Sequence, residues 1–334
     1  MNRKKLIWQL PFLTLLIIGT ILIVQKERNI PYQQHKGMVF GTFYTITYQC
    51  DSNLHGSILQ VLQQVDNSLS TFNKASIVSA INRNECPELN EMFVQVYNTA
   101  MQVSAETDGD FDITVAPLVN VWGFGFKHDT APTPAVIDSL KRTIGYRTLK
   151  IEQTNGKQYL RKEHPETMLD FSAVAKGYGC DAVANLLRQR GVKNFMVEIG
   201  GEIVADGINS KQKPWKIGVS KPIEDTLNTN QGIDTVLNIT NKAMATSGNY
   251  RNFYYKDGKK YAHTIHPKTG YPVQHSLLSA TVLAPTCATA DAYATAFMVM
   301  GIEKAKKILE RHPELRVYFI YAEGDKMRSW SNGK

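Results

Sequence analysis

The chain has 334 residues, of which 43% are hydrophobic and 20% charged, the balance of a folded globular protein. This composition excludes a disordered, collagen-like or coiled-coil chain. The formal net charge is +8, but residues 1–30 hold five basic side chains against one acidic one, so half of the excess lies there. The rest of the chain has no basic stripe with interleaved aromatic residues, and we therefore predict no nucleic-acid partner.

The N-terminus has the pattern of a single membrane-spanning helix. Leu6–Val24 is an uncharged run of 19 residues, close to the length that crosses a hydrocarbon core, and a basic cluster precedes it. Because basic residues favour the cytoplasmic side, we expect the body of the chain on the outer, periplasmic side of a bacterial inner membrane. A cleavable signal peptide is the alternative, but the residues after Val24 lack the small-x-small pattern of a cleavage site. We predict an uncleaved anchor over residues 1–30 and one folded domain over residues 31–334.

Hydrophobic periodicity and turn residues predict the elements of this domain. In chain order they are a polar linker at 25–36, a strand at 41–48, helices at 58–69 and 92–107, a loop at 122–133, a helix at 173–190, strands at 195–199 and 215–219, a polar excursion at 222–232, a strand at 278–283, helices at 288–300 and 302–311, and a strand at 317–321. Helices and strands do not alternate regularly, so the predicted fold class is α+β in a single compact domain of mixed helices and sheets.

The segment Asp170–Asp181 suits an anion such as a phosphate. A strand that ends at Ser172 and Ala173 and turns into a helix with Lys176 would present free backbone N–H groups and one ammonium. The glycines of Val197–Glu202 would let a second backbone segment come close. The alternative is a structural tight turn with a solvated lysine.

Asp291 and Thr295 form a second candidate site. They stand four residues apart in a predicted helix, so both side-chain oxygens project from one face and could share a hard cation. Oxygen ligands without a competing soft ligand favour magnesium. The alternative is that Asp291 caps the helix while Thr295 faces the core.

Two further polar segments could carry chemistry. His263 and His266 adjoin a Pro-x-Thr-Gly turn and could bind a metal or supply a general base, or be ordinary surface histidines. The segment Thr107–Thr114 holds three aspartates around one glycine and could be an acid pair or a loop that enters a strand. It lacks the acidic twelfth residue of a calcium-binding loop.

In their order and in their residues these segments resemble the ApbE-type FAD:protein FMN transferases, a family that moves FMN from FAD onto a Thr or Ser of a target flavoprotein. The matching segments lie between Gly41 and Gly301 and are Gly41-Thr42, Leu69–Phe72 with Ser76 and Asn82, Gly109–Leu118, Trp122–Gly125, Asp170–Asp181, Val197–Glu202, Ala245–Arg251, His263–Pro272 and Ala290–Ala296.

The resemblance implies a role for particular residues. It implies that Mg²⁺ is held by the Ala173 carbonyl, Asp291 and Thr295. It implies that FAD, as the substrate, contacts Phe40, Phe72, Asp112, Lys176 and Ile265, where Phe40 stands in place of the family's usual Met. It places His263 in the catalytic neighbourhood, and we expect His263 to act as the base that takes the proton of the acceptor hydroxyl.

The resemblance therefore implies a magnesium-dependent transferase with an acceptor flavoprotein as its partner. FMN would be joined to a Thr or Ser hydroxyl through a phosphoester bond, and AMP would be released. The alternatives are an FAD-binding module and a pyrophosphatase that releases FMN and AMP to water, because water and a Thr hydroxyl would use the same metal.

Overall fold

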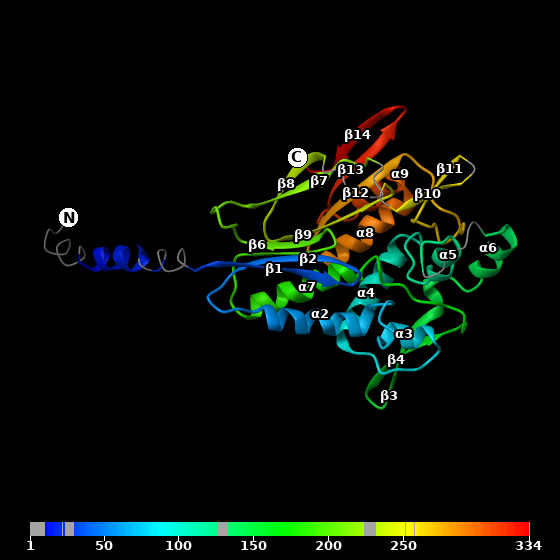
Figure 1. Ribbon diagram of the computed structural model, residues 1–334, viewed down its shortest axis with the longest axis horizontal. Coiled ribbons are helices and arrows are strands. Elements are labelled where there is room, and N and C mark those ends of the chain that lie inside the picture. The colour runs from blue at the N-terminus through cyan, green and yellow to red at the C-terminus, as the bar shows by residue number, and fades with distance from the viewer. Residues whose placement is uncertain are drawn as a thin grey trace.

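A computed structural model describes residues 11–21, 23, 30–125, 132–223, 232–250, 252–256 and 258–333. Its centre is an eight-stranded sheet in the order β1-β2-β5-β6-β9-β12-β13-β14, in which all neighbouring strands are antiparallel (Figure 1). These strands are β1 (Tyr32–Val39), β2 (Thr42–Gln49), β5 (Phe195–Ile199), β6 (Glu202–Asp206), β9 (Lys242–Gly248), β12 (Leu277–Ala284), β13 (Arg316–Glu323) and β14 (Lys326–Ser331).

The remaining strands form two-stranded antiparallel sheets. They are β3 (Leu149–Thr154) with β4 (Lys157–Lys162), β7 (Trp215–Ser220) with β8 (Ile233–Ile239), and β10 (Phe253–Lys256) with β11 (Lys259–Ala262). The helices are α2 (His55–Leu69), α3 (Ile77–Asn82), α4 (Glu91–Glu106), α5 (Ala116–Val121), α6 (Pro134–Lys141), α7 (Ala175–Gln189), α8 (Cys287–Met300) and α9 (Ile302–Leu309). The fold therefore mixes helices and antiparallel strands, which confirms the predicted α+β class.

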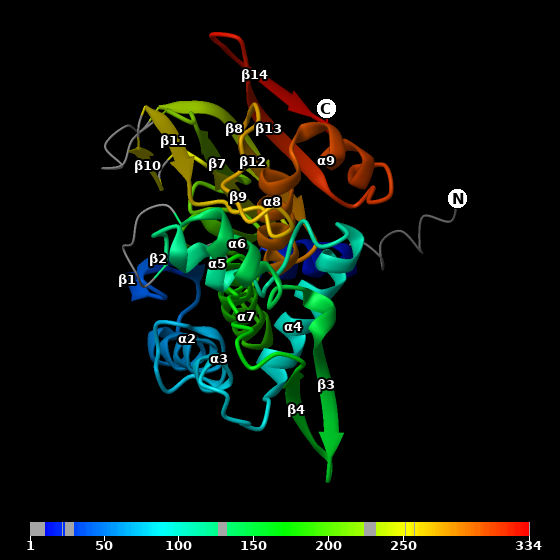
Figure 2. The same cartoon turned by 90° about the vertical axis from the view of Figure 1, so that its right-hand side faces the viewer.

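The two faces of the main sheet are covered differently. Helix α7 contacts β5 and β6, α8 contacts β9 and β12, and α2 and α4 lie on the same side (Figures 1 and 2). On the other face β7 and β8 pack over β6 and β9 through an apolar cluster that includes Ile203, Trp215 and Met244. The helices α7 and α8 are thus held in a fixed position relative to the sheet.

Small residues let α7 and α8 approach closely. A Cβ atom at Gly177 would lie 2.3 Å from the Cys287 carbonyl oxygen, so only glycine fits at this crossing. The Asp181 carboxylate of α7 accepts hydrogen bonds from the backbone nitrogens of Cys287 (2.8 Å) and Ala288 (2.9 Å), which caps the start of α8. The cap is thus supplied by Asp181 and by Thr286, and the alternative that Asp291 caps this helix is wrong.

Most predicted elements are confirmed, with ends that differ by a few residues. The predicted polar linker is wrong at its C-terminal part, because Tyr32–Val39 is the edge strand β1. Its alternating side chains pair with β2 across a turn in which Phe40 (φ 53°) and Gly41 (φ 73°) are left-handed. The strand expected before α7 is also absent, since residues 167–171 have no regular structure and 172–174 form a turn.

At the N-terminus, residues 11–21 and 23 are helical. Within the described residues, no helix combines the length and the apolar character that crossing a membrane requires. The predicted span Leu6–Val24 extends over residues 6–10, 22 and 24, which lie outside the described residues, as do 126–131 of the predicted loop and 224–231 of the predicted polar excursion.

The α7–α8 crossing generates a matched pair of substitutions. Gly177→Ala should lower the free energy of unfolding by about 2 kcal/mol, because its Cβ would clash with backbone atoms that cannot move independently. Gly56→Ala in α2 has no atom within 4 Å of its added Cβ and should be neutral or stabilising by up to about 1 kcal/mol. Urea unfolding of both variants measures the difference, and equal stabilities would contradict the close crossing.

Candidate active site

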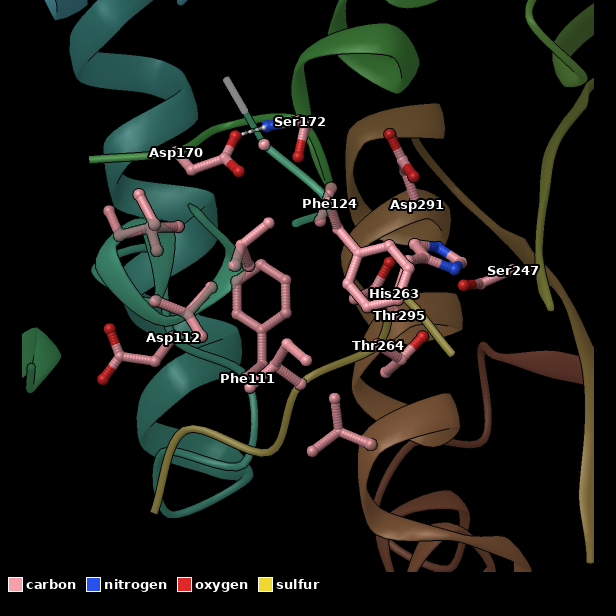
Figure 3. Close-up of a pocket in the computed structure, with 18 of the residues that line it drawn as sticks. Phe111, Asp112, Phe124, Asp170, Ser172, Ser247, His263, Thr264, Asp291 and Thr295 are labelled. Atoms are coloured by element: carbon pink, nitrogen blue, oxygen red, sulfur yellow. Dashed lines mark hydrogen bonds between the residues drawn. The ribbon is translucent and has the colours of Figure 1, made fainter. Parts of the chain in front are cut away.

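A cavity of about 500 Å³ lies where α7, α8, the C-terminal end of β9 and the segments 110–125 and 263–267 meet (Figure 3). Eight of the nine residues to which the family resemblance assigns a role line it, and they are Phe72, Asp112, Ala173, Lys176, His263, Ile265, Asp291 and Thr295. Phe40 is the exception, because its ring packs beside Gly179 of α7 and it is not among the lining residues. The structure thus brings together segments that are more than 200 residues apart in the sequence.

Three charged side chains that line this cavity lie close to one another. The Lys176 ammonium in the first turn of α7 lies 3.3 Å from Glu202 Oε1 and 3.8 Å from Asp291 Oδ2, and it donates to the Ser172 carbonyl at 3.1 Å. Glu202 begins β6, directly after Gly200 and Gly201, and its side chain is only 5% exposed. Asp291 is the fifth residue of α8 and its side chain is 6% exposed. Two buried carboxylates therefore share one ammonium.

The pKa values reflect this imbalance of charge. Burial alone would lower the pKa of Lys176, but the neighbouring Asp291 and Glu202 carboxylates outweigh it and raise the pKa above its ordinary value. Burial raises the pKa of both Glu202 and Asp291, and the Lys176 charge opposes this only in part. Glu202 Oε2 is buried without a hydrogen-bond partner within the described part of the chain. The site is short of positive charge.

The Ala173 carbonyl is arranged to accept an external ligand. Ala173 lies one residue before Val174, the N-cap of α7, so the helix provides no donor for its carbonyl, and the N–H of Gly177 donates to Asp291 Oδ2 at 3.2 Å. No hydrogen bond to the Ala173 oxygen occurs among the residues that the structure describes. A carbonyl, a carboxylate and the hydroxyl of Thr295 line one cavity, and these oxygen donors together with the missing positive charge fit a hard divalent cation.

The expected cradle of free backbone N–H groups is wrong in part. The N–H groups of Val174 and Ala175 both donate to the Phe171 carbonyl, and Gly177 donates to Asp291. The positive charge that this segment offers to an anion is therefore mainly the Lys176 ammonium.

His263 follows β11 and points into the cavity beside the edge of the Phe124 ring, with 6.4 Å between the ring centroids (Figure 3). Its Nδ1 lies 3.2 Å from the Asn252 carbonyl oxygen, which can only accept a hydrogen bond, so the proton is on Nδ1 and the lone pair on Nε2. Burial lowers the pKa of His263, the Asn252 hydrogen bond opposes this effect, and the Lys176 charge reinforces it. The ring is therefore a neutral proton acceptor at neutral pH.

The Asp112 carboxylate accepts hydrogen bonds at both of its oxygens. Its Oδ1 accepts from the Thr114 nitrogen (2.8 Å) and hydroxyl (2.6 Å), and its Oδ2 accepts from the Tyr146 nitrogen (2.7 Å). Both oxygens thus fix the loop that lines the cavity. Burial, the largest effect, raises the pKa of Asp112, although these hydrogen bonds oppose the rise.

His266 lies outside the lining of this cavity. Its Nε2 is 3.7 Å from Asp110 Oδ1, and Asp110 also pairs with Lys268 (3.0 Å) and Lys304 (3.1 Å). No group of three or more His, Cys, Asp or Glu side chains is placed to hold a metal ion anywhere in the described ranges. A histidine-rich metal site at His263 and His266 is therefore not formed.

Sequence reasoning missed Glu202 as a site residue. Glu202 is the last residue of the motif Val197–Glu202, and only the two glycines of this motif were assigned a role from the sequence. The signal that could have identified it is a carboxylate placed directly after two glycines at the end of a buried strand, where a side chain turns back toward the neighbouring helix.

Comparison with known proteins identifies the family of this chain. The sequence pattern of the ApbE family matches residues 40–319. The chain is 36% identical to the FAD:protein FMN transferase of Escherichia coli K12 over 305 residues, which cover 88% of this chain and 86% of that protein. It is 38% identical to the FAD:protein FMN transferase of Haemophilus influenzae over 309 residues, with 89% and 88% covered.

Solved structures give the same result. The flavin transferase ApbE from Vibrio cholerae superimposes with a TM-score of 0.81 at 34% identity and covers 90% of this chain and 97% of that one. The apo form of the Pseudomonas stutzeri flavinyl transferase ApbE gives a TM-score of 0.78 at 31% identity, with 90% and 94% covered. The chain therefore belongs to the ApbE family.

Proposed function

We infer that this chain is a FAD:protein FMN transferase, an enzyme that moves FMN from FAD onto a target protein. The observation that carries this function is the single cavity in which Lys176, Asp291, Thr295 and His263 meet, inside the region that matches the family. The relatives that match over most of their length carry this activity in their names.

The reaction needs electrostatic help more than covalent chemistry. A hydroxyl oxygen of the acceptor attacks the phosphorus of the FMN half of FAD, the pyrophosphate P–O bond breaks, and AMP leaves with the bridging oxygen. Negative charge builds up on the phosphoryl oxygens, so a nearby positive charge lowers the barrier. Lys176 supplies such a charge from the first turn of α7.

We propose that the Ala173 carbonyl, Asp291 and Thr295 hold Mg²⁺. The support is the oxygen donor set, the Ala173 carbonyl, which has no hydrogen-bond donor among the described residues, and the two buried carboxylates that share one ammonium. When bound there, Mg²⁺ would supply further charge neutralisation at the FAD pyrophosphate.

We further propose that His263 takes the proton of the acceptor hydroxyl at Nε2, and that the acceptor residue is a Thr or Ser of a flavoprotein. The domain 31–334 would carry the reaction, and an anchor over residues 1–30 would hold it at the outer side of a bacterial inner membrane. The support for the anchor is the uncharged run Leu6–Val24 behind a basic cluster.

Mass spectrometry tests this function. A candidate acceptor flavoprotein is incubated with the chain, FAD and Mg²⁺, and the expected result is the addition of one FMN on a Thr or Ser together with release of AMP. Release of FMN and AMP with an unmodified acceptor would make the chain a pyrophosphatase, and FAD binding without AMP release would make it a binding module.

The proposed cation site predicts unequal effects of two substitutions in α8. Asp291→Ala removes the only formal negative charge among the proposed ligands and should raise the Mg²⁺ concentration for half-maximal transfer by on the order of a hundredfold. Thr295→Ala removes a neutral oxygen that water can replace, so the rise should be on the order of tenfold or less. Transfer assayed across a Mg²⁺ series measures both, and an unchanged Mg²⁺ requirement in Asp291→Ala would refute the site.

His263 predicts a loss of rate without a loss of substrate binding. His263→Ala should lower the transfer rate by about 10²- to 10⁴-fold while FAD affinity, measured by flavin fluorescence, stays nearly unchanged. Because burial lowers its pKa, the parent rate should rise with pH only below about 6.5, and this rise should vanish in the variant.

His266→Ala is the matched control for this experiment. It removes a partly buried histidine three residues away that does not line the cavity, so rate and pH profile should be kept. Loss of FAD binding in His263→Ala would instead identify His263 as a ligand contact.

A further inference from the structure

The Lys176 ammonium has three acceptors around it. It donates to the Ser172 carbonyl at 3.1 Å and faces Glu202 at 3.3 Å and Asp291 at 3.8 Å. An ammonium has three donors, so all three contacts can exist together, but the carboxylate of Glu202 is the nearer one. Lys176 therefore lies between Asp291, a proposed cation ligand, and Glu202, which is not one of the proposed ligands.

Glu202 belongs to the main sheet, whereas Lys176 and Asp291 belong to helices. Gly200 (φ 66°) and Gly201 (φ 106°) form the left-handed turn between β5 and β6, and Glu202 is the first residue of β6. A Cβ at Gly200 would lie 3.2 Å from Lys176 Cδ, so this turn passes directly beside the lysine side chain. The sheet thus carries the Glu202 carboxylate, and α7 packs against the same strand, where the Cys180 thiol donates to the Glu202 carbonyl oxygen at 3.2 Å.

A lysine that pairs closely with Asp291 competes with a divalent cation for that carboxylate, because the two positive charges repel each other. The Lys176 side chain is only 28% exposed, so a second carboxylate within reach makes it easier for the ammonium to move away from Asp291. Glu202 is such a carboxylate, and its Oε2 atom is buried without a hydrogen-bond partner in the described chain.

We propose that Glu202 is a positioning residue that draws the Lys176 ammonium away from Asp291 and so leaves Asp291 available to a divalent cation. This inference rests on the proposed cation site. It differs from a direct role of Glu202 as a ligand, because Glu202 acts through Lys176 and its effect depends on that lysine.

The dependence on Lys176 makes the inference testable by a double-mutant cycle. Mn²⁺ serves as the probe because it prefers the same oxygen ligands as Mg²⁺. The concentration of free Mn²⁺ is measured by electron paramagnetic resonance. The full chain in detergent is titrated with Mn²⁺, with and without FAD, as parent, Glu202→Gln, Lys176→Met and the double variant. Binding is read without turnover.

With Lys176 present, Glu202→Gln should weaken Mn²⁺ binding at least about fivefold, because the ammonium then pairs more closely with Asp291 and competes with the metal. In the Lys176→Met background, the same change should weaken binding less than about twofold, because no competing cation remains. An equal or larger loss in that background would overturn the inference and make Glu202 a ligand. No loss with Lys176 present would also overturn it.

Asp181→Asn is the matched control. Asp181 is a buried carboxylate of α7 that interacts electrostatically with Asp291, but its oxygens accept from the start of α8. Its removal tests the loss of a nearby negative charge alone, and its effect on Mn²⁺ binding should be similar with and without Lys176. An effect that vanishes without Lys176 would show that any nearby charge acts in this way and would overturn the specific role of Glu202.

Two further variants separate the possible failures. If Glu202→Gln does not fold, as judged by thermal melting, Glu202→Asp replaces it, because its shorter side chain keeps the charge but lies farther from Lys176 and should give a smaller loss of the same kind. Asp291→Asn tests the cation site itself. Mn²⁺ binding that is absent in the parent or unchanged in Asp291→Asn would refute the proposed site, whereas binding that needs Asp291 but ignores Glu202 refutes only this inference.

Discussion

One ammonium shared by two buried carboxylates is the interaction on which this site depends. Lys176 comes from α7, Asp291 from α8 and Glu202 from the turn before β6, so each group is fixed by a different element. Taking charges out of water is unfavourable unless they are compensated, and here the compensation is incomplete. Because positive charge is short, the site can bind a cation, either alone or together with a ligand that carries the cation.

The rest of the fold keeps these three elements at contact distance. The crossing of α7 over α8 requires Gly177, whose missing side chain makes room for the Cys287 backbone and whose N–H binds Asp291. The antiparallel sheet beneath them fixes the β5–β6 turn, and β7 and β8 support its other face. A site of electrostatic rather than covalent chemistry needs such rigidity, because fixed charges stabilise a transition state only where they need not rearrange.

The sequence predicted long, strongly periodic elements well and short strands poorly. The helices around Ile58–Leu69 and Ala288–Met300 carry clear apolar patterns, whereas β1 has a polar outer face and is stabilised by pairing with β2, which no local pattern reports. The site residues were predicted by resemblance, and most of them line one cavity. The role of Glu202 depends on its place beside Lys176, which its motif indicates only weakly. The hydrogen bond from the Tyr146 nitrogen to Asp112 joins residues 34 positions apart, and no local pattern predicts it.

The central claim is that a cation at Asp291 and the FAD pyrophosphate meet in this cavity. Electron–nuclear double resonance of the chain with Mn²⁺ and FAD tests it most directly, since the electron spin of bound Mn²⁺ couples to phosphorus nuclei only at close range. The account predicts a ³¹P coupling in the parent protein that is lost in Asp291→Asn. Bound Mn²⁺ without any ³¹P coupling, or a coupling that persists in Asp291→Asn, would contradict it.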